Sequence, residues 1–134
     1  MELKATELRI GNYIFWDIPE KKNIIHVVDA ILPNTYHTIP ISLGNHKDYR
    51  AIPLTEKWLL DFGFKTIMVN LYKLSIETWK ELYVSLNSDG NVHFYISNGF
   101  NEIVIRRGKL CVHHIQNVFH DFTGEELTIN PQKH

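Results

Sequence analysis

The sequence lacks three features that would each define a class of protein. It has one cysteine, Cys111, which cannot form an internal disulfide and whose neighbours Leu110 and Val112 favour a small buried hydrophobe over a nucleophile. No apolar run approaches the roughly 20 residues of a membrane-spanning helix. No charge dominates, because 14 Lys and Arg against 15 Asp and Glu give a net charge of -1. That balance gives no electrostatic footprint for duplex nucleic acid.

Signatures of catalysis are also missing. There is no Gly-rich phosphate loop, no GxSxG elbow and no paired Cys motif. The aspartates Asp61, Asp89 and Asp121 fall on unlike predicted elements, and no His-carboxylate pair can be argued from their spacing. We therefore expect a non-catalytic protein with no catalytic residues, no cofactor and no metal ion. A hydrolase that uses the histidines near the end of the chain is the enzymatic alternative.

What is present indicates a globular protein. A hydrophobic content of 44% and a charged content of 22% are ordinary for a soluble domain. The 134 residues suit one domain, with a strand-rich part over 1–52 and a helix, a meander and a second helix over 53–130. The N-terminal MELKATELRI carries acidic residues where a signal peptide needs a basic and then an apolar region, which favours a cytoplasmic location.

The first part of the chain is predicted to form strands. ELRIGNYIFW has Gly11-Asn12 as a turn between apolar pairs, and NIIHVVDAI is rich in β-branched residues. Prolines, Gly and Asn between 32 and 53 predict long loops, with one short strand over 38–42. These strands can form a small SH3-like half-barrel.

A short helix over 56–62 follows, with clear signals at both ends. Thr55 is a suitable N-cap, Leu54 and Leu59 occupy the positions of a hydrophobic staple, and Gly63 stands where the chain leaves in a left-handed conformation.

Four strand-like segments come next and predict an antiparallel β-meander, which gives an α+β fold with two short helices. The stretch 75–82 also fits helical spacing, and we predict a strand there. Matching the apolar faces pairs Leu82, Val84 and Leu86 with residues 92–96 across a Ser88-Asp89-Gly90 turn. The next hairpin should place Phe94 and Ile96 beside Ile105 and Ile103, around Gly99-Phe100 or a loop over 98–101.

The opposite face of this meander gives the main candidate for binding. The register aligns Ser85, His93 and Arg106, with Tyr83, Tyr95 and Val104 as the neighbouring row. Two tyrosines, a histidine and an arginine can stack on a planar ring and contact a phosphate. The alternative is that a helix or a second subunit covers this face.

The stretch VHHIQNVFHDFTGEEL predicts an amphipathic helix over 113–123, ended by Gly124. Its apolar stripe is Ile115, Val118, Phe119 and Phe122, which we expect to pack against the apolar face of the meander. His113, Gln116, Asn117 and His120 lie on the other side. They form an exposed polar face, interact with groups near the helix N-terminus, or form a binding edge. No pair one turn apart offers two good zinc ligands. An anion could dock at the first turn, which Arg106, Arg107 and Lys109 precede.

Three stretches resemble a family of small proteins of Bacteroidetes bacteria and their phages or mobile elements. They are LRIGNYI, IPLTEKWLLDFGF and VHHIQNVFHDFTGEEL, where the family typically has LRIGNYV, IPLTEEWLLKFGF and VHQLQNLYFALTGEEL. His113, Gln116 and Asn117 stand in the family pattern, whereas His114, Ile115, His120 and Asp121 depart from it, which removes His120 from any family-wide role. The resemblance implies an accessory protein of mobile elements, for which host interaction and counter-defence are common tasks.

These observations favour a non-catalytic binding protein that holds a nucleotide-like ligand or a host protein. The candidate binding residues are Tyr83, His93, Tyr95, Arg106, Arg107, His113, Gln116 and Asn117. A nucleic-acid-associated SH3-like module is the alternative from another class, and near-neutral charge disfavours it. Homo-oligomers are compatible with the sequence, and a membrane partner is not expected.

Overall fold

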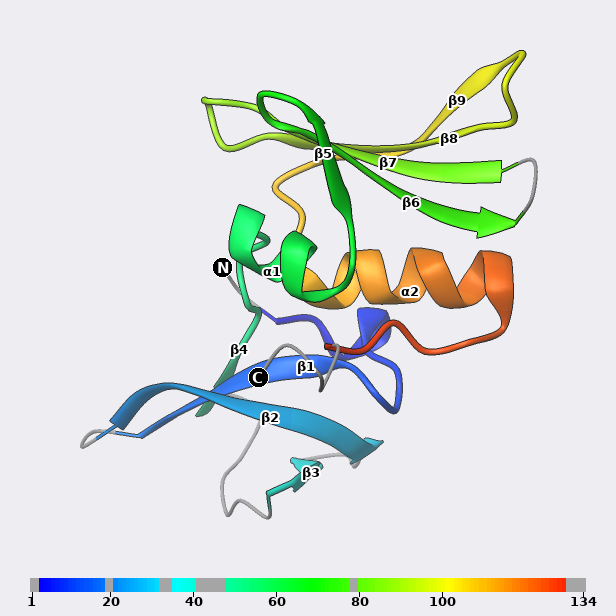
Figure 1. Ribbon diagram of the computed structural model, residues 1–134. Helices are drawn as coiled ribbons and strands as arrows, with labels where there is room; N and C mark the ends of the chain where they lie inside the picture. The colour runs from blue at the N-terminus through cyan, green and yellow to red at the C-terminus, as the bar shows by residue number, and fades with distance from the viewer. Residues whose placement is uncertain (1–2, 19–20, 32–34, 41–47, 78–79, 130–134) are drawn as a thin grey trace. The chain divides into compact units, whose positions relative to one another are not determined.

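The chain divides into two compact units. The computed structural model describes residues 3–18, 21–31, 35–40, 48–77 and 80–129 (Figure 1). Unit 1 comprises Met1–Pro53 and Cys111–Val118, and unit 2 comprises Leu54–Leu110 and Phe119–His134. The break after Pro53 lies one residue from the predicted boundary between the two parts. A single domain stays a prediction. No helix among the described residues is long and apolar enough to cross a membrane.

Unit 1 contains a four-stranded antiparallel sheet with the strand order β3-β2-β1-β4. Its strands are β1 (Tyr13–Ile18), β2 (Lys21–Ile31), β3 (Tyr36–Ile39) and β4 (Tyr49–Arg50), and a 3-10 helix η1 (Ala5–Glu7) precedes them. The turn predicted at Gly11-Asn12 is present, with Gly11 at φ 101°. The short strand predicted over 38–42 lies at 36–39 instead, and residues 41 and 42 fall outside the described residues. The SH3-like half-barrel stays a prediction.

The core of unit 1 forms on one face of this sheet. Alternate residues of β1 and β2, such as Ile14 and Val28, are buried together with Leu8, Tyr36 and Tyr49. The rings of Tyr36 and Tyr49 meet edge to face with centroids 5.1 Å apart.

A buried histidine, His26, lies in the same sheet. Its ring nitrogen Nδ1 hydrogen-bonds to the Thr38 hydroxyl at 2.9 Å, and burial lowers the pKa of His26. The neutral ring is therefore favoured, as expected of a polar group inside a packed sheet.

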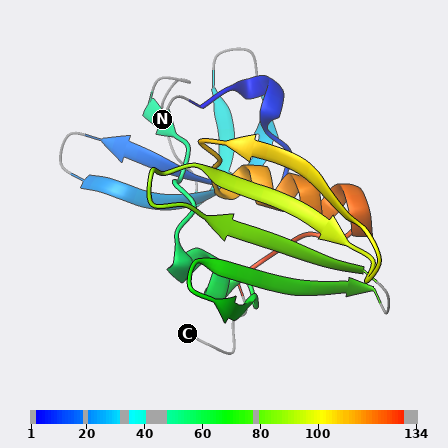
Figure 2. The same cartoon turned by 90° about the horizontal axis from the view of Figure 1, so that it is seen from above.

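Unit 2 contains the predicted meander as a five-stranded antiparallel sheet with the order β5-β6-β7-β8-β9 (Figure 2). Its elements are the helix α1 (Glu56–Asp61) and the strands β5 (Lys65–Met68), β6 (Leu71–Glu77), β7 (Lys80–Leu86), β8 (Val92–Ser97) and β9 (Glu102–Gly108). The ambiguous segment 75–82 is strand on both sides of residues 78 and 79, which lie outside the described residues.

Helix α1 begins and ends where its sequence signals indicate. The Thr55 hydroxyl accepts the Trp58 amide at 3.5 Å, and Gly63 adopts φ 101°. The Phe64 amide donates to the Leu59 carbonyl at 3.0 Å, which brings the chain back over the end of the helix. The side of the sheet that α1 covers follows from one bond, because the Tyr72 hydroxyl of β6 donates to the Glu56 carboxylate at 2.6 Å.

The register of the central hairpin is the predicted one. Leu82 pairs with Ile96, Val84 with Phe94 and Leu86 with Val92, and Gly90 takes φ 87° in the turn. Except for Leu86, their side chains are buried and alternate with half-buried ones, so β7 and β8 have one buried face and one partly open face.

The last hairpin differs from its prediction in one respect. Ile96 pairs with Ile103 and the loop spans 98–101 as expected, but Phe94 pairs with Arg106, not Ile105. A bulge between Phe94 and Tyr95 inserts one extra residue into β9 and shifts the register beyond it. Ile103 is 65% exposed, so its expected place in the core is also wrong.

Helix α2 (Val112–Thr123) belongs to both units, since the division of the chain falls between Val118 and Phe119. It begins one residue before the predicted start and ends as predicted, with Gly124 at φ 74°. Ile115 and Val118 of the predicted stripe are buried, whereas Phe119 is half-buried and Phe122 is 43% exposed. The buried part of the apolar stripe therefore ends at Val118.

Candidate functional site

The predicted polar side of α2 is largely buried. Gln116 is 0% exposed and His113 is 2% exposed, while Asn117 and His120 are half-buried. The solvent-exposed polar face is therefore wrong for His113 and Gln116. Of the predicted alternatives, interaction with nearby groups holds for Gln116 and Asn117, whose partners come from the first 13 residues.

Gln116 forms hydrogen bonds with the backbone at the start of β1. Its carboxamide oxygen accepts the Tyr13 amide at 2.8 Å, and its Nε2 donates to the Gly11 carbonyl at 3.2 Å. A buried carboxamide that makes both bonds to backbone groups stabilises them where water cannot. This arrangement fixes the start of β1 against the helix.

Asn117 makes a second set of bonds to the same segment. Its Nδ2 donates to the Glu7 carbonyl at 2.6 Å, and its Oδ1 accepts from Asn12 Nδ2 at 2.9 Å and from Arg9 Nε at 3.1 Å. Asn12 is itself 0% exposed, and its Oδ1 accepts the Arg9 amide. The side chains of Gln116 and Asn117, two residues of the predicted binding edge, are thus occupied by their own chain.

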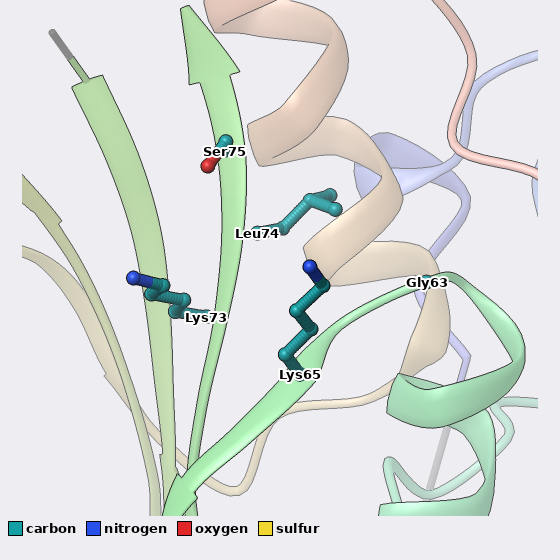
Figure 3. Close-up of a pocket in the computed structure, with 5 residues that line it drawn as sticks. All are labelled: Gly63, Lys65, Lys73, Leu74 and Ser75. Carbon is teal, nitrogen blue, oxygen red and sulfur yellow. The ribbon is translucent and has the colours of Figure 1, made fainter. Parts of the chain in front are cut away.

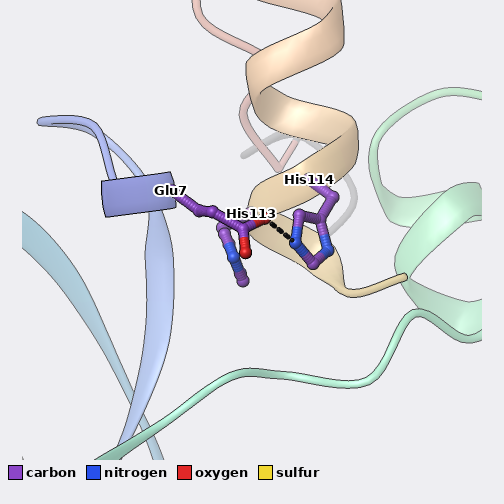
Figure 4. A group of neighbouring side chains, drawn as sticks. All are labelled: Glu7, His113 and His114. Carbon is purple, nitrogen blue, oxygen red and sulfur yellow. Dashed lines mark hydrogen bonds and ion pairs between the residues drawn. The ribbon is translucent and has the colours of Figure 1, made fainter. Parts of the chain in front are cut away.

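His114 joins the helix start to η1. Its Nδ1 accepts the Cys111 amide at 2.8 Å, and its Nε2 lies 2.7 Å from Glu7 Oε2 (Figure 4). Because Nδ1 accepts a hydrogen bond, the ring proton must be on Nε2, from which it is donated to the carboxylate. His114 is the third residue of the helix, and Cys111 directly precedes the first. In a capping box, Glu or Gln at this third position makes the same bond to the amide of the capping residue.

The group Glu7, His113 and His114 has the residue types of a metal site. One potential ligand atom from each lies within 4.8 Å of the others, and the two imidazole centroids are 4.1 Å apart (Figure 4). Ligation through His114 Nε2 would require that atom to lose its proton and Nδ1 to gain one, which breaks the bond from the Cys111 amide. The hydrogen bonds therefore favour a structural pair over a metal centre. The prediction considered only pairs one turn apart along the helix and therefore missed the adjacent His113 and His114 together with Glu7.

The anion site predicted at the first turn of α2 is not favoured either. The Val112 amide already donates to the Ile52 carbonyl at 2.8 Å, and His113 and His114 are buried. Lys109, one of the predicted cations, donates to the Asp89 carbonyl at 2.6 Å.

The second candidate lies on the sheet of unit 2, on the face that carries Tyr83 and Tyr95. We call it the outer face, since Tyr72 and Val84 point to the opposite side, where α1 lies. Figure 1 shows no described helix of unit 2 over the outer face. The covering helix considered from the sequence is therefore not present within this unit.

One row of directly paired residues crosses the whole outer face. We call it the tyrosine row, and it consists of Lys65, Lys73, Tyr83, Tyr95 and Val104, one from each strand. The predicted alignment of Tyr83, Tyr95 and Val104 is confirmed, and the two lysines at its other end were not foreseen. They were missed because the prediction stopped at three strands.

The two tyrosine rings are stacked on each other. Their centroids are 5.3 Å apart and their planes differ by 6°, and both side chains are half-buried. Burial is the main cause that raises the pKa of Tyr95, followed by the charge of Glu102. Each ring has one face that the other does not use.

Next to the tyrosine row lies a row that carries positive charge. Ser85 pairs with His93 and His93 pairs with Arg107. The prediction of Arg106 in this row is wrong, because the bulge in β9 places Arg106 opposite Phe94. Arg107 is exposed, and within the described residues neither its guanidinium nor the His93 ring makes a hydrogen bond or ion pair.

The other neighbouring row is acidic. Glu81 pairs with Ser97 and Ser97 pairs with Glu102. Glu81 also forms an ion pair with Lys73 at 3.0 Å, and this contact is the main cause that raises the pKa of Lys73. The outer face is thus positive on one side of the tyrosines and negative on the other.

Comparison of the chain with protein-family models, with curated proteins and with solved structures finds no match. The candidate sites therefore stand on their geometry alone.

Proposed function

We propose that this protein is a non-catalytic binding protein whose outer face holds a nucleotide-like ligand. The observation that carries the proposal is the stacked pair of Tyr83 and Tyr95, half-buried on the face of the sheet that α1 does not cover. Aromatic side chains displayed on a sheet bind bases by stacking, because every base has a π-face.

The chemistry around the pair suits a ligand with an anionic group. His93 and Arg107 on one side offer donors that the described residues do not use, and Lys73 flanks Tyr83. Glu81 and Glu102 on the other side repel an anion. The ligand's ring would lie over the tyrosines with its anionic group within reach of these cations.

We propose in addition that the protein serves a mobile element, as the resemblance of its three sequence stretches implies. A protein that holds a nucleotide-like molecule can remove it from a host process, which is a form of counter-defence. A host protein seated on the same face is the alternative occupant.

The proposal is tested by titration calorimetry of the four ribonucleoside monophosphates and of a short single-stranded oligonucleotide. We expect saturable binding of at least one monophosphate. Replacing Tyr83 by Ala should weaken it by about 5- to 150-fold, which corresponds to the roughly 1–3 kcal/mol of one base-aromatic stack.

Tyr83→Phe is the matched control, because it keeps the ring and removes only the hydroxyl. We expect it to bind within about twofold of the wild type. Tighter binding of the oligonucleotide than of any monophosphate would assign the face to single strands. If no titration gives heat and no amide of β7 or β8 shifts in NMR spectra, the proposal is wrong.

A further inference from the structure

A hollow of about 290 Å³ lies where β5 separates from β6. It is lined by Gly63, Lys65, Lys73, Leu74 and Ser75 (Figure 3). The pairing of β5 with β6 ends at Lys65 and Lys73, so Leu74 and Ser75 have no partner on that side in the described part of β5. The hollow is therefore a gap at the sheet edge with two lysines at its mouth.

The two lysines are directly opposite each other in the register. Like charges at directly paired positions destabilise a sheet, so this pair opposes folding unless an anion lies between them. Lys73 is partly compensated by Glu81, at 3.0 Å. Lys65 makes no hydrogen bond or ion pair within the described residues, and its side chain extends beside β6 (Figure 3).

The hollow continues the tyrosine row. Lys73 pairs with Tyr83, so the lysine pair begins one strand away from the stacked rings, roughly 5 Å across the sheet. A ligand that stacks on Tyr83 can therefore reach Lys73 and Lys65 with a group attached to its ring system.

We propose that this hollow binds the phosphate of the ligand held on the outer face, with Lys65 as its main contact and Lys73 as the second. The inference rests on the proposed function, since it names the anionic subsite of the same face. Lys73 would turn from Glu81 to the phosphate. Gly63 adopts φ 101° and a side chain there would be strained, which keeps this wall of the hollow low.

The test compares each nucleoside with its 5′-monophosphate by titration calorimetry at low salt. We expect the monophosphate to bind about tenfold more tightly, and Lys65→Gln to abolish that advantage while leaving nucleoside affinity within twofold. Lys57→Gln is the matched control, because Lys57 lies on α1 and pairs with Asp61 at 2.7 Å. It should keep the full tenfold difference.

Inorganic pyrophosphate provides a readout that does not depend on stacking. In NMR spectra it should shift the amides of Gly63, Leu74 and Ser75 in the wild type and in Tyr83→Ala, but not in Lys65→Gln. Equal affinity for nucleoside and monophosphate would overturn the phosphate subsite and leave the proposed function standing. Pyrophosphate shifts without any nucleoside binding would keep the anion site and refute the base-stacking face. Absence of pyrophosphate shifts in the wild type also overturns the subsite.

Discussion

The two units use polar side chains in opposite ways. In unit 1, Gln116 and Asn12 are fully buried and bonded to their own chain, and Asn117 is tied to the same segment. On the outer face of unit 2, His93, Arg107 and Lys65 are at least partly exposed and make no such bonds within the described residues.

This difference separates architecture from binding. A buried polar group must be paired, so its bonds report on folding and leave it no capacity for a ligand. Polar groups that stand unused around a half-buried aromatic pair contribute little to folding. The outer face is therefore the better candidate for function, although both regions looked equally polar in the sequence.

The largest expected effect is the loss of stability when a buried polar side chain of unit 1 is removed. Gln116→Ala should lower the free energy of unfolding by about 3–5 kcal/mol, because the Tyr13 amide and the Gly11 carbonyl lose their partner inside the protein. Urea denaturation measures the loss. Asn101→Ala removes a carboxamide that is exposed on a hairpin loop and should stay within about 0.5 kcal/mol. Similar losses for the two variants would contradict the comparison.

A buried polar bond in unit 2 tests whether burial, not the unit, decides the effect. Tyr72→Phe removes the bond to Glu56 and should cost about 1.5–3 kcal/mol at pH 7. Burial, aided by Glu56, raises the pKa of Tyr72 to about 12 from 10.0, so the neutral phenol stabilises the fold fully below pH 10. That contribution is lost as the pH rises from 10 to 12.

The measurement is the difference in unfolding free energy between wild type and Tyr72→Phe across pH 8 to 11. The difference should be constant up to about pH 9.5 and shrink above it. A difference that grows with pH would reverse the sign and show that the phenolate is favoured by folding.

A smaller effect is expected at the start of α2. His114→Ala removes the acceptor of the Cys111 amide and the partner of Glu7, and should cost about 1–2 kcal/mol. His114→Gln should recover most of this, because Gln at the same position makes the capping-box bond and can donate to a carboxylate. The measurement is the midpoint of thermal denaturation of the wild type and of both variants, with and without Zn²⁺. A zinc-dependent gain in wild type that His114→Gln lacks would revive the metal centre.

The smallest expected effect concerns the outer face. His93→Ala and Arg107→Ala should each change the free energy of unfolding by less than about 0.5 kcal/mol. Each should still weaken binding of the monophosphate found by calorimetry. A loss of stability as large as that of Gln116→Ala would show that this face serves folding, as the polar side of α2 does.

Local signals account for what the sequence predicted well. Thr55 and Gly63 mark the two ends of α1 through contacts within a few residues. The alternation of apolar residues predicts the pairing of Val84 with Phe94. The tyrosine pair followed from the same register.

The errors have a different physical origin. A helical pattern cannot distinguish a polar side that faces water from one that meets a distant segment, and the partners of Gln116 lie 103 and 105 residues away. The bulge in β9 has no signal in the alternation of apolar residues, and it exchanged Arg106 for Arg107 beside His93. Predicting the lysine pair required the position of β5. This is an edge strand whose residues are all exposed, so its sequence shows no alternation of apolar and polar residues between the two faces.

The division of α2 between the units has a consequence for the order of folding during synthesis. The meander pairs neighbouring strands only, so its contacts can form as soon as residues 65–108 have left the ribosome. Unit 1 is synthesised first, yet its network needs Gln116 and Asn117, which emerge more than 100 residues after Arg9. The N-terminal part of the chain must therefore wait for the C-terminal part before it can complete this hydrogen-bond network, so a chain that ends before α2 has all the strands of the meander but lacks the partners that unit 1 needs.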